Sequence, residues 1–314
     1  MAELLVLSED DVRSVLAFDE LAESLTVALV ALSEGSVSVP PRIAARSPSG
    51  LLGAMPGYVP ALGLAAKLVS VYPHNPQLGE PAHQALIAVF DEVTGAPCAV
   101  MGGTYITAIR TAMTTGLVAR ALARPQSTSL AIIGAGVQAE AHLSAFTHLM
   151  ALNDIRIASR HISKAAQLAE RHTGAVVAAA VEEALDGADL VCCCTDAREP
   201  VLADGWISPG THVSSVGSGP ELPGALLGRA QLFVESRAAT APPPAGAVEL
   251  QGLDPGSLTE VGDVLAGRSG GRATAESVTV FKSTGHAAED VAAAAVVLRR
   301  ARVVGAGTAV IMAS

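Results

Sequence analysis

A glycine turn between an apolar run and a helical stretch is the feature that most constrains this chain. Residues 129–133 are apolar and β-rich, the turn reads Gly134-Ala135-Gly136-Val137-Gln138-Ala139, and residues 140–150 are helix-like. Gly134 permits a tight turn, Gly136 leaves the backbone open to a pyrophosphate, and Ala139 lets the helix pack closely on the strand. The free N–H groups at the helix start then point at the phosphates. This strand–turn–helix context predicts a dinucleotide site, whereas an isolated glycine turn would not.

The end of the next predicted strand, at residues 154–158, bears on which dinucleotide is bound. An NAD-preferring site usually has a carboxylate about 20 residues after the glycine turn, where it accepts hydrogen bonds from the ribose. Here the strand is followed by Ser159-Arg160. A hydroxyl beside a guanidinium suits a 2′-phosphate, which arginine can hold with two hydrogen bonds. We predict NADPH as cofactor, with NADH as the alternative if Arg160 is a solvated loop residue.

Composition and charge exclude several classes of partner. The net charge of -10 argues against nucleic acid and against an anionic membrane surface. No secretory signal pattern and no apolar run of membrane-spanning length is present, so we expect a cytoplasmic protein. Neighbours in the run Cys192-Cys193-Cys194 alternate faces of a strand, so we expect that the run neither chelates one metal nor forms ordinary disulfides. It is typical of a buried strand in a reducing compartment. We expect no metal site, because Cys and His do not occur at zinc-ligand spacings.

The order of the predicted elements indicates an α/β chain with two domains. Residues 130–234 alternate strands and helices in the manner of a Rossmann doubly wound parallel sheet, with residues 212–216 and 232–234 as its last two strands. The first hundred residues instead predict a helix over 12–32, followed by short extended segments. A helix and a strand close the chain and could return to the first domain. We expect a mixed α+β substrate and dimerisation domain at 1–114, completed by 290–314, and a dinucleotide-binding domain at 115–289.

Three cationic residues form the candidate substrate site. Lys67 lies in a predicted strand with apolar neighbours, where partial desolvation would lower its pKa and suit it to proton transfer to a carbonyl or imine. The alternative is a lysine whose ammonium extends from an edge strand into water. Arg42 and Arg110 could each hold a carboxylate with the planar guanidinium, although a lone arginine is more often in a surface ion pair.

Several ordered motifs together resemble the ornithine cyclodeaminase/mu-crystallin family. They are Ala66-Lys67-Leu68-Val69-Ser70, Pro73-His74-Asn75-Pro76, Ile109-Arg110-Thr111-Ala112, the glycine turn, 260–268, 281–285 and 289–294. The resemblance covers nearly the whole chain. It implies a homodimer in which both chain ends build the substrate and dimerisation domain.

The resemblance also implies a role for particular positions. Lys67 matches the active-site lysine at the reacting centre, and Arg42 and Arg110 match the arginines that hold the substrate α-carboxylate. Thr111 is expected beside the cofactor phosphates. The other positions implied to bind or flank the cofactor are Gly134, Ala135, Gly136, Val137, Gln138, Ser159, Arg160, Thr195, Val216, Gly217, Ser218 and Lys282.

One departure from the cyclodeaminase pattern changes the expected reaction. Cyclodeaminases carry an aspartate just after the glycine of the strand-end motif, but here Val216-Gly217-Ser218-Gly219 runs into Pro220-Glu221-Leu222. Without that general base, the simpler reaction is hydride transfer to a C=N bond. Glu221 would replace the aspartate only if its loop folded inward, and His286 is a further residue that could reach the substrate.

We therefore predict an NADPH-dependent imine or ketimine reductase, or a reductive aminase of small 2-oxo acids. Lys67 would protonate or polarise the nitrogen while Arg42 and Arg110 hold the carboxylate. Two alternatives stay open. One is an ornithine cyclodeaminase-type lyase with bound NAD, and the other is a crystallin-like NADPH-binding protein with little catalysis.

Overall fold

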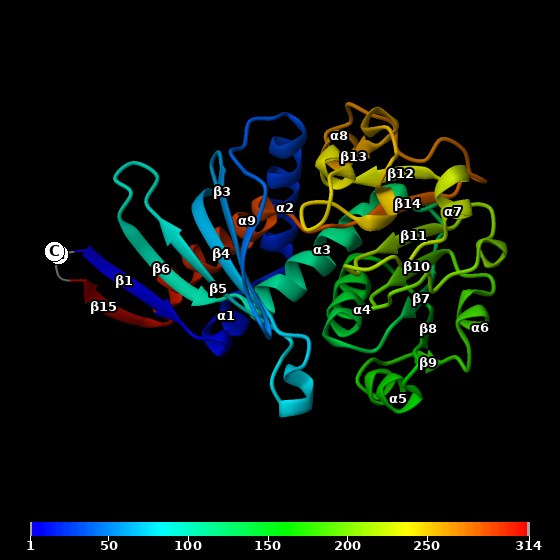
Figure 1. Cartoon of the computed structure of the whole chain (residues 1–314), viewed down its shortest axis with the longest axis horizontal. Coiled ribbons are helices and arrows are strands. Elements are labelled where there is room, and N and C mark those ends of the chain that lie inside the picture. Colours follow the sequence, from blue (N-terminus) through cyan, green and yellow to red (C-terminus); the bar gives the residue numbers. More distant parts are fainter. Residues whose placement is uncertain (1, 313–314) are drawn as a thin grey trace. The chain divides into compact units, whose positions relative to one another are not determined.

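The computed structural model describes residues 2–312, which form two compact units (Figure 1). Of the described residues, those up to 110 and those from 286 form the terminal unit, and residues 111–285 form the central unit. The sequence places the two boundaries four residues later, at 114/115 and 289/290. The first boundary falls inside one continuous helix, α3 (Thr104–Leu122), so no break in the helical pattern marks it. The predicted closing segment also extends two residues past the described part of the chain.

The terminal unit is built around a seven-stranded mixed sheet with the order β15-β1-β6-β5-β4-β3-β2. β1 pairs parallel to β6, and the other neighbours are antiparallel. Its elements besides α3 are β1 (Ala2–Leu7), α1 (Glu9–Val15), α2 (Phe18–Ser33), β2 (Ile43–Ser47), β3 (Gly50–Val59), β4 (Gly63–Val71), η1 (Asn75–Leu78), β5 (His83–Phe90), β6 (Pro97–Gly102), α9 (Ala287–Val304) and β15 (Thr308–Met312). Both chain ends therefore contribute strands to one sheet.

Helix α9 packs directly on one face of this sheet. A Cβ at Gly57 of β3 would lie 3.2 Å from a methyl group of Val291, so glycine permits the close approach of helix and strand. Met55, Lys67, Ile87 and Met101 are paired across β3, β4, β5 and β6, and all four are buried on this face. Position 67 of β4 therefore faces α9.

The predicted single helix over residues 12–32 is wrong, because two helices occupy this region. α1 begins after Ser8, whose side chain accepts a hydrogen bond from the Asp11 N–H while Asp11 accepts one from the Ser8 N–H. It ends at Leu16, which is extended, and α2 begins after Ala17. Asp19 and Glu20 lie in the first turn of α2, where carboxylates interact favourably with the helix dipole.

The central unit is a doubly wound α/β fold, as predicted. Its eight-stranded sheet has the order β13-β12-β14-β11-β10-β7-β8-β9, and every neighbouring pair is parallel. Its elements after α3 are β7 (Ser129–Ile133), α4 (Val137–Leu149), β8 (Asp154–Ala158), α5 (Ile162–Glu170), β9 (Ala175–Val177), α6 (Val181–Leu185), β10 (Leu190–Cys193), η2 (Asp204–Trp206), β11 (His212–Ser215), α7 (Gly224–Arg229), β12 (Gln231–Val234), η3 (Arg237–Thr240), η4 (Val248–Leu250), η5 (Pro255–Ser257), β13 (Thr259–Glu260), α8 (Val261–Leu265) and β14 (Thr279–Lys282).

Two strands of this sheet are missing from the sequence prediction. β14 lies between β11 and β12 although it follows both in the chain, and β13 forms the edge beyond β12. The predicted last strands, β11 and β12, are thus separated by a strand from about 50 residues downstream. Among the described residues, no helix is long and apolar enough to cross a membrane.

Candidate active site

Lys67 and Asp290 form a buried ion pair in the terminal unit. Lys67 extends from β4 toward the first turn of α9, and its Nζ lies 2.9 Å from Oδ1 and 2.8 Å from Oδ2 of Asp290. Each side chain is only 2% exposed. The alternative of a lysine that extends into water is therefore wrong, because α9 covers this face of β4 and supplies a carboxylate to it.

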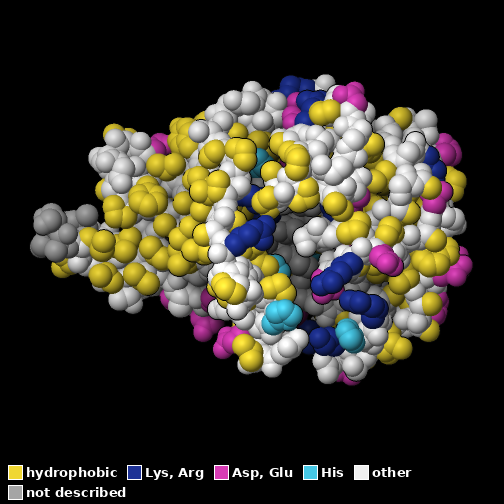
Figure 2. All heavy atoms as spheres, viewed as in Figure 1, with side chains coloured by type: hydrophobic (Ala, Val, Ile, Leu, Met, Phe, Trp, Pro, Cys, Tyr) yellow, Lys and Arg dark blue, Asp and Glu magenta, His cyan; other side chains and the backbone are white. Residues whose placement is uncertain are grey.

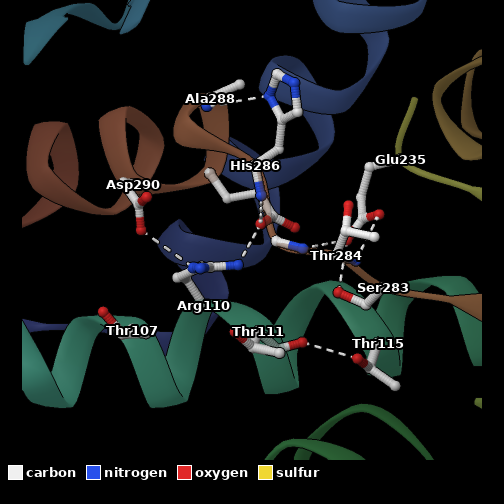
Figure 3. A network of polar contacts seen from close by, with 12 residues as sticks. Thr107, Arg110, Thr111, Thr115, Glu235, Ser283, Thr284, His286, Ala288 and Asp290 are labelled. Atoms are coloured by element: carbon white, nitrogen blue, oxygen red, sulfur yellow. Dashed lines mark hydrogen bonds and ion pairs between the residues drawn. The ribbon is translucent and has the colours of Figure 1, made fainter. Parts of the chain in front are cut away.

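Arg110 joins the same cluster from α3. Its Nε donates to Asp290 Oδ1 at 3.1 Å (Figure 3). Its Nη1 donates to Glu289 Oε2. Glu289 also accepts a hydrogen bond from the His286 N–H at 2.9 Å, while His286 Nδ1 accepts one from Ala288 N. This reciprocal capping box starts α9 and fixes the side chain of Glu289, which meets Arg110. We name Lys67, Arg110, Glu289 and Asp290 the buried charge cluster.

Burial and charge shift the pKa values in this cluster. Desolvation lowers the pKa of Lys67 to about 8, although the negative charge of Asp290 opposes the shift. Desolvation alone would raise the pKa of Asp290, but Lys67 and Arg110 hold it below the usual aspartate value. The cluster is therefore an ionised aspartate beside an amine that can lose its proton near neutral pH.

Two more predicted residues, Arg42 and His286, lie in the terminal unit, as does His83. Arg42 is partly buried just before β2. Desolvation is the main cause of the lowered pKa of His286, and the positive charges of Arg42 and Arg110 lower this pKa further. Desolvation and the charge of Lys67 lower the pKa of His83. Both histidines are therefore neutral at pH 7, and Arg42 and Arg110 act electrostatically on the same imidazole.

The glycine turn of the central unit has the geometry that a dinucleotide requires. Gly134 has φ +124°, and a Cβ there would lie 2.5 Å from the carbonyl oxygen of Cys194. Gly136 caps α4, and a Cβ on it would meet no atom within 4 Å, so the space above it is open to a phosphate. Ala139 is fully buried between α4 and the sheet. Ala135, Val137 and Gln138 complete the turn at the helix N-terminus, so these residues fit a pyrophosphate.

Ser159 and Arg160 follow β8 at the carboxyl edge of the same sheet. The Arg160 side chain is 78% exposed and lies 3.1 Å from Asp196, which is also exposed. The Ser159 hydroxyl oxygen accepts a hydrogen bond from the His161 N–H at 3.2 Å. An exposed ion pair of this kind contributes little to stability, so Arg160 is available to an incoming phosphate.

Glu221 fastens the loops that follow β10 and β11. Its Oε1 accepts hydrogen bonds from the Thr195 N–H and hydroxyl, both at 2.7 Å. Its Oε2 accepts from the Ser215 hydroxyl at 2.7 Å and from the Gly217 N–H at 2.8 Å. The side chain is fully buried. Both oxygens are occupied by loop donors, so Glu221 supports Thr195 and Gly217 and does not stand in for the missing aspartate.

Lys282 supports the same loop from inside the sheet. Its Nζ donates to Gly217 O at 2.7 Å and to Ser215 Oγ at 2.9 Å, and it pairs with Glu249 at 3.2 Å. The side chain is 2% exposed. Its polar contacts therefore act on the backbone around Val216–Ser218, of which Ser218 alone is exposed. Thr111, on α3, is buried.

Glu289 and Asp290 belong to the family motif at 289–294, which by itself predicts no role for them. Asp290 lies 223 residues from its partner Lys67, and Glu289 lies 179 residues from its partner Arg110, so no local spacing could pair them. The available signal was two adjacent carboxylates at the start of an alanine-rich helix, a usual place for acidic residues. No sequence motif or spacing indicates a role for Glu249, the partner of Lys282.

The parallel doubly wound sheet with this turn is typical of Rossmann-type dinucleotide-binding proteins. The other unit carries a buried lysine among an arginine and two carboxylates. A model of the ornithine cyclodeaminase/mu-crystallin family matches residues 2–304, and the chain belongs to that family. The resemblance seen in the motifs is thereby confirmed.

Relatives and solved structures match over nearly full length. Rat ketimine reductase mu-crystallin is 38% identical over 303 residues, covering 93% of this chain and 95% of the relative. The structure of Thermococcus litoralis Δ1-pyrroline-2-carboxylate reductase, in complex with NADH and L-proline, has a TM-score of 0.92 and 32% identity and covers 98% of this chain and 100% of its own. An archaeal alanine dehydrogenase dimer with bound NAD has a TM-score of 0.87 and 30% identity, covering 99% and 100%.

Proposed function

We propose that this protein reduces a small cyclic or acyclic 2-imino acid to the amino acid, with NADPH as the hydride donor. The observation that carries this proposal is the buried charge cluster, in which an amine with a pKa of about 8 is held by an ionised aspartate. The ketimine, pyrroline-2-carboxylate and alanine activities in the names of its relatives support the same class of reaction.

The reaction balances with one hydride and one proton. The glycine-turn residues Gly134–Gln138 would hold a reduced nicotinamide dinucleotide, and this cofactor would supply the hydride that the imine carbon accepts as its C=N π bond is lost. The Lys67 ammonium would give its proton to the substrate nitrogen. The Lys67 side chain is then a neutral amine beside Asp290 until it takes up a proton from solvent. The substrate carboxylate would be held by Arg42 and Arg110, because a planar guanidinium can bind a carboxylate with two hydrogen bonds.

A direct assay tests this function against the cyclodeaminase alternative. The purified protein is supplied with NADPH or NADH and a panel of cyclic ketimines, or 2-oxo acids with ammonia or methylamine, and the loss of reduced-nicotinamide absorbance is followed. We expect turnover with at least one imine and none with ornithine. Ammonia and proline from ornithine without net cofactor change would instead establish a lyase. Tight cofactor binding without turnover of either kind would leave a crystallin-like binding protein.

The pH dependence of reduction follows from the lowered pKa of Lys67. Because reduction requires the protonated amine, kcat/KM is expected to fall as pH rises through about 8, while the oxidative direction, which needs the free amine, rises over the same range. Initial rates in both directions across about pH 6 to 10 measure this. Parallel profiles in the two directions would contradict a proton-transferring Lys67.

The preference for NADPH rests on Arg160. Replacing Arg160 by Ala is expected to weaken NADPH binding about 10- to 100-fold and leave NADH binding unchanged, because a charge-assisted pair with the 2′-phosphate is lost. Fluorescence titration with both cofactors measures the effect. Arg171→Ala is a matched control, since Arg171 forms a similarly exposed pair with Glu140 at 3.2 Å. Equal losses for both cofactors would mean that Arg160 does not select NADPH.

We also propose that the protein is a homodimer assembled through the open face of the terminal sheet. The residues on this face, opposite Lys67 and α9, are uncharged, and hydrophobic side chains cover it in Figure 2. They include Leu52, Pro56, Tyr58, Leu64, Leu68, Leu86, Phe90, Val100 and Val6. An apolar sheet face of this extent is typical of an interface, and a solved neighbour is described as a dimer.

Analytical ultracentrifugation tests the dimer. Leu86→Asp introduces a charge at the centre of the open face and is expected to give monomers, whereas Val248→Asp, at a similarly exposed position of the central unit, should leave the dimer intact. A wild-type protein that sediments as a monomer at micromolar concentration would overturn the proposal.

A further inference from the structure

Three soft metal ligands meet in the core of the central unit, outside the residues discussed above for substrate or cofactor. Cys192 of β10 and Cys194 just after it lie on one face of the strand, with their sulfur atoms 3.6 Å apart. His142 of α4 lies against them, and the three ligand atoms are all within 4.8 Å of one another. The alternation that sends Cys193 to the other face is the same alternation that brings Cys192 and Cys194 together.

The histidine is already oriented as a ligand. His142 Nδ1 lies 2.7 Å from the carbonyl oxygen of Gln138, which can only accept, so Nδ1 carries the proton and Nε2 bears the lone pair in the neutral ring. Nε2 lies 3.2 Å from Thr115 Oγ1, but that hydroxyl donates its hydrogen to Thr111 O at 2.8 Å. The lone pair is therefore left to the two thiols. A histidine whose second nitrogen donates to a backbone carbonyl is the usual arrangement in metal sites.

The sulfur spacing also suits a shared ion. Two sulfurs each about 2.3 Å from one zinc ion, at the tetrahedral angle, lie about 3.8 Å apart. The observed 3.6 Å is close to this value, and Thr115 Oγ1 offers an oxygen for a fourth position. A disulfide between Cys192 and Cys194 is an unsuitable alternative. The Cα atoms of residues i and i+2 on an extended strand are more than about 6.5 Å apart, which is at the upper limit of the Cα–Cα distances that disulfides allow.

We infer that His142, Cys192 and Cys194 form a binding site for a divalent thiophilic ion, with Zn²⁺ as the expected occupant. Binding breaks two S–H bonds, the two protons pass to solvent, and two thiolates then neutralise the 2+ charge. A neutral centre is the form that an apolar core tolerates best. Two thiolates and one imidazole also favour zinc over magnesium or calcium, which prefer oxygen.

The site has a defined consequence for the dinucleotide turn. Cys194 N donates to Ile133 O at 2.8 Å, and the carbonyl oxygen of Cys194 is the atom that a Cβ on Gly134 would meet. His142 lies on the helix that begins at Val137. An ion held by Cys194 and His142 would therefore tie α4 to the end of β10, which is hydrogen-bonded to the last residue of β7 beside the turn. We expect it to raise the melting temperature of the protein.

Metal content and cadmium spectroscopy test the inference in a Cys98→Ser background, which removes the one cysteine outside the run. Protein expressed in zinc-supplemented medium is expected to retain about one zinc per chain after dialysis. Protein refolded with Cd²⁺ should show the ultraviolet cadmium–thiolate charge-transfer band. Cys192→Ser and Cys194→Ser should each lose most of both signals.

Cys193→Ser is the matched control, because this buried thiol lies on the same strand but faces the other core cluster. It should keep both signals, and circular dichroism establishes that each variant is folded. Wild-type protein without bound zinc and without the cadmium band would overturn the inference and leave the thiols as core packing. Signals that survive in Cys192→Ser and Cys194→Ser but vanish in Cys193→Ser would overturn it as well.

Discussion

Replacement of Lys67 by Met is expected to lower the turnover number for imine reduction about 10²- to 10⁴-fold, because the proton donor to the nitrogen is lost. NADPH binding should persist, since the glycine turn and Arg160 lie in the central unit, whereas Lys67 lies in the terminal unit. Steady-state kinetics with the best imine of the panel, together with cofactor titration, separate the two effects. A variant that retains wild-type turnover would exclude Lys67 from the chemistry.

Stability must be controlled in this experiment, because Lys67→Met leaves Asp290 with Arg110 as its remaining ionic partner in the cluster. Breaking a buried ion pair from one side typically costs about 3–5 kcal/mol of the free energy of unfolding. The double variant Lys67→Met/Asp290→Asn removes both charges and should recover much of that loss. If the double variant is stable but inactive, Lys67 has a chemical role. If it recovers turnover, the role of Lys67 is only to neutralise Asp290.

Gly134→Ala is expected to abolish cofactor binding and to destabilise the central unit by about 2 kcal/mol or more. A Cβ at this position would lie 2.5 Å from the carbonyl oxygen of Cys194, and φ at +124° is unfavourable for any residue with a Cβ. Urea unfolding and cofactor titration measure the two losses.

Gly136→Ala is the matched comparison at the same turn. A Cβ there meets no protein atom within 4 Å, so stability should change little, but the methyl group would occupy space that a pyrophosphate needs. We expect a loss of cofactor affinity of at least about tenfold without a loss of stability. If Gly136→Ala binds NADPH as tightly as wild type, the phosphates do not lie over this residue.

The central fold could be predicted because its signals are local. The turn at Gly134–Ala139 and the alternation of apolar strands with helices each lie within a short window of sequence. The strands β13 and β14 were not predicted, because the sheet topology and not a local pattern sets their pairing. β14 inserts between two strands that precede it in the chain. The break at Leu16 and Ala17 escaped because apolar periodicity continues across it, and only the acidic pair Asp19 and Glu20 marked the new start.

The candidate site was predictable in its cations but not in its anions. Lys67 and Arg110 stood out by motif, and the resemblance gave them roles. Asp290 and Glu289 reach them across 223 and 179 residues, and only the packing of α9 on the sheet makes those contacts. The proximity of His142 to Cys192 and Cys194 was not predictable from local sequence either, because only the fold brings helix α4 against the end of β10.

Strand β4 contributes residues both to the buried charge cluster and to the open face of the terminal sheet. Lys67 points toward α9, while its neighbours Ala66 and Leu68 belong to the open face. Insertion or deletion of one residue in this strand would exchange the two faces, exposing the lysine on the apolar surface and driving apolar side chains against Asp290. Both the contact of Lys67 with Asp290 and the apolar open face therefore constrain the length of this strand during evolution. We expect changes in substrate range to arise in the loops at its ends.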